Sequence, residues 1–369
     1  MTFASNRAVR SVALDATLWD EPTTGIGLYT RELASALLAQ GVTVERLGAQ
    51  RSGERPRRMQ SRTAWALAEL PDVLLASTAQ LFHAVNNFNL PLRRMPGKRM
   101  VLTVHDVIPD LFPRTVSVPY RWQFRLWLTR SLKVADRVIC VSRCTRADLL
   151  RRFEVDAERV HVVPNGVDHL DRLPPLDATS ARYLDSLALP EAFVLYAGSL
   201  DARKNVGLVL DALVELRRRG RNVPLVLAGQ SWFGSGEVER RIGRLRADGF
   251  DLRPLGYLEP ALFYAVMRRA TVFVFPSLYE GFGLPPLEAM KLGVPCVVSN
   301  AGSLPEVVGD AAVQVPPDDA LRFAREVERL WTQKEARAQL SEAGRKRAAG
   351  FTWAKTAERT IAVYREALR

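Results

Sequence analysis

The 369-residue sequence contains little cysteine and little lysine. Its three cysteines, Cys140, Cys144 and Cys296, are too few for a disulfide framework, and no second Cys or His pair at ligand spacing completes a zinc site. We therefore expect the three thiols to be buried apolar side chains. Only seven of the 52 basic residues are lysine, so a lysine in a loop is not simply one of many solubilising surface lysines.

Several other patterns are absent. No apolar run approaches the ~18–20 residues that span a bilayer, and the N-terminal stretch lacks the apolar core of a signal peptide. The sequence also has no Walker phosphate loop, no G-x-S-x-G elbow and no Asp-x-Asp pair to grip a divalent ion. We expect a cytoplasmic protein, at most peripheral to a membrane, with no bound metal and no cofactor.

The charge is strongly positive, with a formal net charge of +12 and a pI near 10.0. This excess favours acidic partners, which include nucleic acid, an anionic membrane face and phosphate-bearing small molecules. No aromatic-rich basic motif or helix-turn-helix spacing is present, so we do not expect nucleic acid to bind. Residues 1–170 hold 24 basic and 16 acidic side chains, so an acidic surface is expected to meet this half.

Short apolar runs alternate with longer helical patterns along the chain. The expected strands are Val9–Leu14, Val42–Arg46, Leu81–Ala84, Arg99–Val104, Arg137–Val141, Val160–Val163, Phe193–Ala197, Pro224–Ala228, Val272–Phe275, Cys296–Val298 and Ala311–Val315. This alternation predicts an α/β protein with doubly wound parallel sheets, whose ligands bind at the carboxyl ends of the strands.

A proline-containing stretch, Asp168–Pro190, separates two sets of strands and is the expected linker. It divides the chain into an N-terminal domain, 1–170, and a C-terminal domain, 171–351. After the helices expected at Asp319–Gln333 and Glu335–Ala348, a last helix begins at the N-cap Thr352. No strand is left for that helix to follow, so the pattern alone does not say where it packs.

The strongest local signal is the stretch 276–290, which follows a strand and leads into a helix that starts with two prolines. Glu280 is expected in the loop and Glu288 in the first helical turn. Gly281 and Gly283 allow the backbone to approach a ligand closely. Two carboxylates around a helix start suit a ligand rich in hydroxyl groups. The alternative is a Gly/Pro turn with two solvated acids.

A second strand, Phe193–Ala197, also ends in a loop that opens a helix, Val206–Arg218. Arg203 and Lys204 lie side by side at this turn, and a guanidinium fork beside an ammonium suits a diphosphate. The alternative is a solvated basic loop.

A glycine pair follows the first strand, before a helix expected at Leu28–Ala39. Gly25 and Gly27 match half of a dinucleotide fingerprint, and Glu45 lies about 20 residues further on. The third glycine position is occupied by Thr30, however. The pair therefore indicates a loop whose amides approach a charged ligand, or else an NAD-dependent dehydrogenase.

His105 and Asp106 are expected at the carboxyl end of the strand Arg99–Val104, where α/β enzymes place their chemistry. A lone histidine is often structural, and both interpretations remain open.

The stretch 114–133 is basic and aromatic. On a helix, Phe124, Trp127, Leu128 and Ser131 can share one face, and Arg121, Arg125 and Lys133 can form a stripe. Such a helix could contact an anionic membrane and meet a lipid-linked acceptor, or it could be a core helix with a solvated basic face.

Taken together, these segments resemble the family 4 retaining glycosyltransferases of the GT-B fold. Seven segments match in the family's order: Gly25–Gly27, His105–Pro109, Val141–Arg143, Val163–Asp168, Arg203–Lys204, Glu280–Glu288 and Pro305–Gly309. The resemblance implies two Rossmann-like domains facing a cleft. It also implies that the helix at 352–369 crosses back onto the N-terminal, acceptor-binding domain, and that the C-terminal domain binds the donor.

The resemblance also implies roles for individual residues. Arg203 and Lys204 would hold the diphosphate of a nucleotide-sugar, and Glu288 its ribose hydroxyls. Glu280 would position the donor sugar, together with the backbone of Gly281, Phe282, Gly283 and Leu284. Gly25 to Gly27 would close over the diphosphate, and His105 would lie beside the reacting sugar carbon.

Among such enzymes, the sequence around His105 resembles that of bacterial mannosyl- and rhamnosyltransferases of surface polysaccharide (O-antigen) assembly. The resemblance thus implies transfer of a sugar, with GDP-mannose as the expected donor, to a glycan or lipid-linked acceptor. A GT-B enzyme with another nucleotide-sugar and a soluble acceptor is the alternative.

Overall fold

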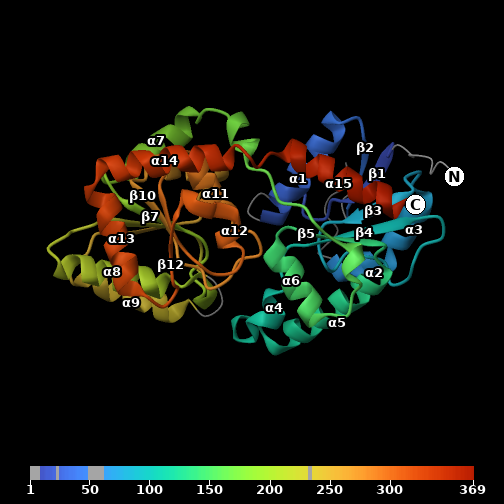
Figure 1. Ribbon diagram of the computed structural model, residues 1–369, viewed down its shortest axis with the longest axis horizontal. Helices are drawn as coiled ribbons and strands as arrows, with labels where there is room; N and C mark the ends of the chain where they lie inside the picture. Colours follow the sequence, from blue (N-terminus) through green and yellow to red (C-terminus); the bar gives the residue numbers. More distant parts are fainter. Residues whose placement is uncertain (1–8, 22–24, 49–61, 232–234) are drawn as a thin grey trace. The chain divides into compact units, whose positions relative to one another are not determined.

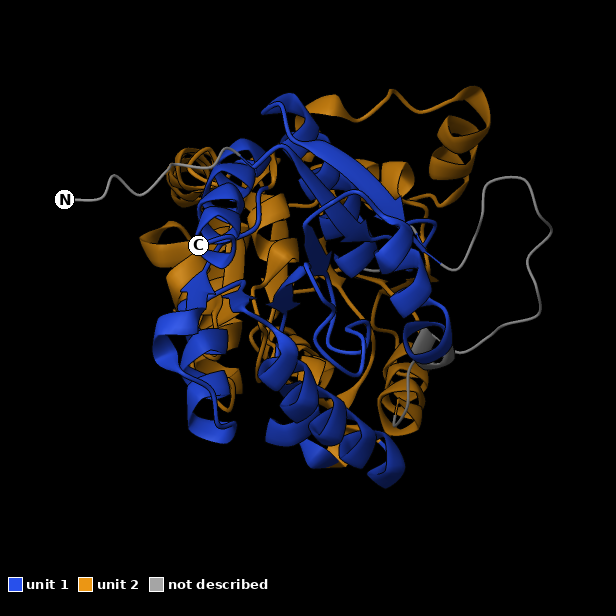
Figure 2. Ribbon diagram, turned by 90° about the vertical axis from the view of Figure 1, so that its right-hand side faces the viewer, with its two compact units in different colours: residues 1–113, 117–166, 352–369 blue, residues 114–116, 167–351 orange. Residues whose placement is uncertain are grey.

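A computed structural model describes residues 9–21, 25–48, 62–231 and 235–369. The chain divides into two compact units (Figure 2). Unit 1 comprises residues 1–113, 117–166 and 352–369, and unit 2 comprises residues 114–116 and 167–351.

Unit 1 contains a six-stranded parallel sheet in the order β2-β1-β3-β4-β5-β6. Its strands are β1 (Ser11–Asp15), β2 (Thr43–Leu47), β3 (Leu81–Ala84), β4 (Arg99–Val104), β5 (Arg137–Cys140) and β6 (Val160–Val162). Its helices are α1 (Gly25–Ala39), α2 (Arg62–Ala68), α3 (Leu70–Ala76), α4 (Ile108–Leu111), α5 (Val118–Val134), α6 (Arg143–Arg152) and α15 (Trp353–Ala367), with the short 3-10 helix η2 (Ala157–Arg159). A further 3-10 helix, η1 (Pro113–Thr115), contains residues assigned to both units.

Alternate residues of these strands pack into two separate hydrophobic cores, one on each face of the sheet. Val12 and Leu14 of β1 pack with Leu33 of α1 and Ile361 of α15 on one face of the sheet. Ala13 faces the opposite core, which contains residues of α2, α3, α5 and α6. Strand side chains point to opposite faces in turn, so a strand buried on both sides reads as a continuous apolar run.

The last helix, α15, packs on unit 1 beside α1 (Figure 1). Its first turn lies so close to the loop after β6 that a Cβ on Gly166 would be 2.3 Å from the Trp353 nitrogen. The Thr356 hydroxyl donates to the Pro164 carbonyl at 2.8 Å. The glycine of the Pro164-Asn-Gly segment is therefore needed for this close backbone approach.

A buried polar chain links α15 to the sheet. The Tyr364 hydroxyl lies 2.7 Å from His83 Nδ1, and His83 Nε2 lies 2.7 Å from the Thr103 hydroxyl. The Tyr29 hydroxyl of α1 lies 3.0 Å from the same Thr103 oxygen. Burial, followed by repulsion from His105, lowers the pKa of His83 to about 3, so His83 is a neutral donor and acceptor.

Unit 2 contains a second parallel sheet, in the order β12-β11-β10-β7-β8-β9. Its strands are β7 (Val194–Ala197), β8 (Leu225–Ala228), β9 (Leu252–Gly256), β10 (Val272–Phe275), β11 (Cys296–Ser299) and β12 (Val313–Val315). Its helices are α7 (Ala178–Ser186), α8 (Val206–Arg218), α9 (Gly236–Ala247), α10 (Pro260–Arg269), α11 (Leu284–Lys291), α12 (Leu304–Val308), α13 (Ala320–Thr332) and α14 (Lys334–Ala348), with 3-10 helices η3 (Asp168–Arg172), η4 (Ala202–Lys204) and η5 (Gly309–Ala311). Helices cover both faces of each sheet (Figure 1).

The order of strands in unit 2 reverses direction between β7 and β10. From β7 the chain proceeds outward to β8 and β9, and it then returns to β10 on the other side of β7. In doubly wound sheets, ligands bind at such a reversal, at the carboxyl ends of the two central strands. The loops after β7 and β10 are the two that contain Lys204 and Glu280.

The α/β class with doubly wound parallel sheets is confirmed. Strand β9 was not among the predicted strands, because Pro254 and Gly256 disfavour a strand in the sequence pattern. It forms nevertheless because β9 lies at the edge of the sheet, where a strand tolerates both residues. The stretch expected as a linker at 168–190 instead forms η3 and α7. Cys140 and Cys296 are buried, as expected, but Cys144 is half-buried, with its Sγ 3.5 Å from the Asp148 carboxylate.

Candidate active site

Asp201 fixes the backbone of the loop after β7, which carries Arg203 and Lys204. The Asp201 carboxylate accepts from the backbone amides of Arg203 at 3.0 Å and Lys204 at 3.2 Å, and it receives the Ser199 hydroxyl at 2.6 Å. Asn205 closes the turn in a left-handed conformation (φ 55°), and its amide donates to the carbonyl of Pro276 at 3.2 Å. The loops after β7 and β10 are thereby tied together.

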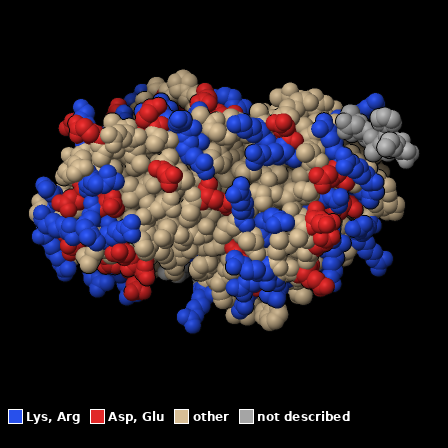
Figure 3. Space-filling view, in the orientation of Figure 1, with Lys and Arg blue, Asp and Glu red and all other residues tan. Residues whose placement is uncertain are grey.

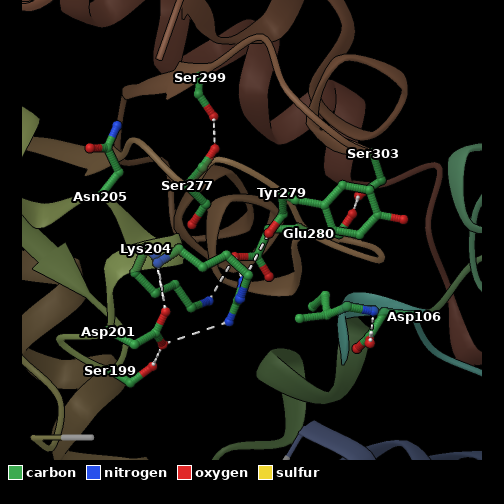
Figure 4. A network of polar contacts seen from close by, with 12 residues as sticks. Asp106, Ser199, Asp201, Lys204, Asn205, Ser277, Tyr279, Glu280, Ser299 and Ser303 are labelled. Carbon is green, nitrogen blue, oxygen red and sulfur yellow. Dashed lines mark hydrogen bonds and ion pairs between the residues drawn. The ribbon is translucent and has the colours of Figure 1, made fainter. Parts of the chain in front are cut away.

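Arg203 and Lys204 converge on one carboxylate oxygen (Figure 4). Arg203 Nη1 and Lys204 Nζ both lie 2.8 Å from Glu280 Oε1, and Arg203 also donates to the Tyr279 carbonyl at 2.8 Å. All three side chains are largely buried, with exposed fractions of 12–13%. Burial by itself raises the pKa of Glu280, but Lys204 and Arg203 outweigh it and hold that pKa below its usual value. The Asp201 carboxylate also lies 3.8 Å from Arg203 Nη2, so the two cations face two carboxylates.

The backbone of Glu280 is fixed from a third loop. The Ser303 hydroxyl donates to the Glu280 carbonyl at 2.9 Å, and the Ser303 amide donates to it at 3.2 Å. A Cβ on Gly302 (φ 59°) would lie 2.7 Å from the Glu280 nitrogen, so this close contact requires glycine. The carboxylate is thus presented by a rigid backbone.

Residues 281–284 lead from Glu280 into α11. Gly283 is the N-cap in a left-handed conformation (φ 93°), and a Cβ there would meet Leu304 at 2.5 Å. The first amides of a helix have no partner within it, which makes the backbone of Phe282, Gly283 and Leu284 suitable for binding oxygen atoms of a ligand. Glu288 was expected in the first turn but is the fifth residue of α11, because the helix begins at Leu284, ahead of both prolines.

Glu288 is buried, with an exposed fraction of 4%, and two residues that the sequence reading did not single out hold it. The Tyr264 hydroxyl donates to Glu288 Oε1 at 2.8 Å, and His169 Nε2 lies 3.3 Å from the same oxygen. Tyr264 lies on α10 and His169 in η3, so neither is near Glu288 in sequence. Glu288 forms no ion pair with Arg203 or Lys204 in the part of unit 2 that is described.

In unit 1, the glycine pair is helical rather than in a loop. Helix α1 begins at Gly25, three residues earlier than expected, so Gly25 and Gly27 both lie in its first turn. Gly25 is exposed, and a Cβ there would meet no atom within 4 Å. Residues 22–24, which precede the glycine pair, lie outside the described residues. Glu45, which a dehydrogenase would need at a strand end, lies within β2 and accepts from the Ser77 hydroxyl at 2.5 Å.

His105 follows β4 and is half-buried against α1. Its Nε2 donates to the Val85 carbonyl at 2.9 Å, and its ring lies edge-on to the Tyr29 ring with centroids 4.9 Å apart. Because the carbonyl can only accept, Nε2 carries the proton and Nδ1 is the acceptor. Burial lowers the pKa of His105, against the weaker opposing effect of the Val85 carbonyl, so the imidazole is neutral at pH 7. The neighbouring Asp106 accepts from the amide of Ile108, the first residue of α4, at 2.9 Å.

A cavity of about 380 Å³ lies next to His105. It is formed by the loops after β1, β3 and β4 and by the first half of α5. Its lining residues are Leu18, Ile26, Asn86, Asn87, Phe88, His105, Asp106, Pro109, Tyr120, Gln123 and Phe124. Amide and carboxylate groups together with aromatic rings suit a ligand that has both hydroxyl groups and apolar C–H surface.

Two further properties concern the described part of the chain. No three or more His, Cys, Asp or Glu side chains in it are grouped so that they could hold a metal ion. None of its helices combines the length and the apolar character needed to cross a bilayer.

Two family models match this chain. The model for glycosyltransferase family 4 matches residues 23–169, and the model for glycosyl transferases group 1 matches residues 185–347. The O-antigen chain mannosyltransferase B of Escherichia coli is 32% identical over 311 residues, which cover 82% of this chain and 77% of that protein.

Solved structures share the fold. The sucrose-phosphate synthase of Thermosynechococcus elongatus superposes with a TM-score of 0.73 at 24% identity, covering 97% of this chain and 99% of that one. Anabaena HepE in complex with UDP-glucose superposes with a TM-score of 0.69 at 18% identity, covering 95% of this chain and 98% of that one. The fold is therefore GT-B, and the chain belongs to the family 4 glycosyltransferases, as a hexosyltransferase.

Proposed function

We propose that the enzyme transfers mannose, with retention of configuration, from GDP-mannose to a hydroxyl group of a glycan acceptor that is linked to lipid. The reaction would belong to the assembly of a bacterial surface polysaccharide, on the cytoplasmic side of the membrane. The observation that carries the proposal is the convergence of Arg203 and Lys204 on Glu280, at the strand-order reversal of unit 2. The mannosyl donor is supported by the similarity to an O-antigen mannosyltransferase.

The cation cluster suits departure of a diphosphate. Glycosyl transfer leaves negative charge on the leaving phosphate, and fixed cations placed where this charge develops lower the barrier. Arg203 and Lys204 would take over the role that a divalent ion has in other transferases. Because Glu280 holds both side chains in place, they need little reorganisation when the donor binds.

The remaining donor contacts follow from α11. Glu280 and the backbone of Gly281, Phe282, Gly283 and Leu284 would hold the hydroxyl groups of the sugar, and Glu288 would accept from the ribose. Gly25 and Gly27 would bring the start of α1 to the diphosphate.

Retention needs no enzyme nucleophile if both bonds change on one face of the sugar. The acceptor oxygen would bond to the anomeric carbon as the carbon–phosphate oxygen bond breaks, and the acceptor proton would pass to an oxygen of the leaving phosphate. His105 would contribute a neutral imidazole, since burial lowers its pKa. A sugar trapped covalently on a side chain of the enzyme would contradict this path.

The cavity beside His105 supports an acceptor site in unit 1. Phe88 and Tyr120 form an aromatic wall, with ring centroids 6.1 Å apart, and Gln123 offers an amide to sugar hydroxyls. The Asn86 amide is held by Asp15 and by the Phe88 nitrogen. A terminal sugar of a glycan would fit a lining of this kind.

A donor screen tests the proposal. The enzyme is incubated with GDP-mannose, UDP-glucose and other nucleotide-sugars, with lipid-linked glycan or with free sugars as acceptors, and products are measured by mass spectrometry. We expect GDP-mannose and the lipid-linked acceptor to give the fastest transfer, unaffected by a metal chelator. Lys204→Ala is the matched control for enzyme-dependent turnover.

A specific alternative is a UDP-sugar donor with a soluble acceptor. It is favoured by structural neighbours that include a UDP-glucose complex and a sucrose-phosphate synthase. Faster turnover of UDP-glucose than of GDP-mannose, with a free sugar as acceptor, would establish this alternative and overturn the proposed donor.

A further inference from the structure

Helix α5 carries an unusual concentration of exposed apolar side chains. Twelve large hydrophobic residues are exposed in the described part of the chain, and four of them, Val118, Tyr120, Trp122 and Leu126, lie in this one 17-residue helix. Val118, Trp122 and Leu126 are spaced four residues apart, so they form a single stripe, and their exposed fractions are 67%, 62% and 68%. Phe124, Leu128 and Ser131, by contrast, are buried in unit 1.

We call the surface formed by Val118, Trp122, Leu126, Thr129 and Lys133 the α5 outer face. The helix that carries it contains four basic residues and no acidic residue. Two of these four cations have partners: Arg125 pairs with Asp110, and Arg130 donates to backbone carbonyls of Leu90 and Pro91. Neither Arg121 nor Lys133 forms an ion pair with any described residue.

The surrounding surface is also basic. In Figure 3, a group of Lys and Arg side chains lies at the lower edge of the region where α4 and α5 lie, among uncharged and some acidic side chains. The single acidic side chain of α4, Asp110, is buried and pairs with Arg125 and Arg152. Glu154 and Asp156 line one surface hollow with Lys133 and Arg159, so carboxylates lie near that end of the α5 outer face, whereas the apolar stripe itself carries basic neighbours and no acidic residue of its own helix.

We propose that the α5 outer face docks the enzyme on an anionic lipid bilayer. Trp and Leu side chains would enter the headgroup region, while Arg121 and Lys133 contact lipid phosphates. A three-residue stripe is much smaller than the ~800 Å² per partner of a stable protein interface, whereas reversible membrane adsorption needs only a few apolar side chains and cations.

The proposed docking would place the cavity of unit 1 close to the membrane surface. Tyr120, which lines the cavity, lies two residues from both Val118 and Trp122, so the docked helix and the proposed acceptor site share one element. An acceptor anchored in the bilayer would then reach the cavity without leaving the membrane. In this respect the inference rests on the proposed function, but vesicle binding itself requires neither donor nor acceptor.

The test is sedimentation of the full-length protein with vesicles of phosphatidylglycerol and phosphatidylcholine, compared with vesicles of phosphatidylcholine alone. We expect binding to the anionic vesicles that weakens with added salt. The variant V118S/W122S/L126S should lose most of this binding, and the variant R121Q/K133Q should lose about fivefold per cation removed. The control L38S/L321S, which removes two apolar side chains of 56% exposure from α1 and α13, should bind like the wild type.

A second readout depends on Trp122 itself. Vesicles that contain brominated lipid should quench part of the protein fluorescence, and W122F should remove that quenched part while it still binds. Unchanged binding by V118S/W122S/L126S, or no preference for anionic vesicles, would overturn the inference. So would a wild-type dimer in light scattering that becomes a monomer in the triple variant, since the face would then bind protein. If vesicle binding holds but no sugar is transferred, the proposed function fails and this inference stands.

Discussion

At the scale of single residues, Glu280 performs two tasks at once. Its Oε1 atom receives both Arg203 and Lys204, which keeps two like charges close together inside a largely buried loop cluster. The carboxylate therefore stabilises the cations before any donor binds, and each cation keeps the carboxylate ionised.

The first prediction concerns Lys204. Lys204→Ala should lower kcat/KM for the donor by ~10²–10³-fold, because a fixed cation near the leaving diphosphate is removed. The fold should persist, since Arg203 still pairs with Glu280. Steady-state kinetics and circular dichroism check the two parts, with Lys346→Ala, an exposed lysine of α14, as the control. Full activity of Lys204→Ala would remove this residue from the diphosphate role.

The second prediction concerns Tyr264, whose hydroxyl holds Glu288 Oε1. Tyr264→Phe should raise the donor KM about five- to tenfold, as loss of one hydrogen bond of ~1 kcal/mol loosens the carboxylate, and should change kcat little. Donor titration by calorimetry should show the same loss. Tyr183→Phe, on the exposed side of α7, is the matched control and should bind donor normally. A fall of about five- to tenfold in kcat at constant KM would contradict this prediction and would indicate a general structural defect.

The residues that the sequence could indicate were those at strand ends. Arg203, Lys204 and Glu280 each follow an apolar strand, so topology alone predicts that they share one edge of a sheet. Their shared contact at a single carboxylate oxygen was not predictable from spacing. Tyr264 and His169 carried no local signal, because their contact with Glu288 joins three elements that are distant in sequence.

At the scale of elements, the start of α11 depends on Gly283. Gly283→Ala should lower the free energy of unfolding by ~1–3 kcal/mol, because alanine at φ 93° is strained and its Cβ meets Leu304 at 2.5 Å. Gly243→Ala, in the exposed interior of α9 with open space around it, should raise that free energy by ~0.5–1 kcal/mol. Urea unfolding of both variants measures these opposite signs. Equal effects would mean that Gly283 has no special conformational role.

Elements with continuous apolar runs were predictable to within about two residues at their ends, as in β3, β4 and α8. Where the predicted elements were wrong, the local preferences of proline and glycine opposed the structure that tertiary packing imposes. Strand β9 accepts Pro254 because it lies at a sheet edge, and α1 extends back through Gly25 and Gly27 despite the poor helix propensity of glycine.

At the scale of the whole molecule, stability should depend on pH through His83. Its pKa is about 3 in the folded protein and about 6.5 in the unfolded chain. Between these values the unfolded chain binds the extra proton, so the folded state loses stability as pH falls, at up to ~1.4 kcal/mol per pH unit. We expect the melting temperature to decrease between about pH 6.5 and pH 4.

A His83→Asn variant isolates this contribution. It should melt below the wild type at neutral pH, because the contacts to Tyr364 and Thr103 change, but the gap between the two should narrow as the solution is acidified. Asp15, whose pKa burial raises, is common to both proteins and cancels in the difference, whereas His105, whose pKa burial lowers, cancels except for its repulsion with His83. Scanning calorimetry measures both curves, and a gap that stays constant with pH would show that His83 is not the group responsible.

The return of α15 to unit 1 has a consequence for how the protein is made. Ribosomes synthesise a chain from its N-terminal to its C-terminal end, so all of unit 2 is translated before α15. Until then, Trp353, Ile361 and Tyr364 are missing from one core of unit 1, and α1 covers only part of that apolar face of the sheet. The second unit made is therefore the first that can finish folding, and the nascent N-terminal part depends on chaperones or on its partial structure until α15 has been made.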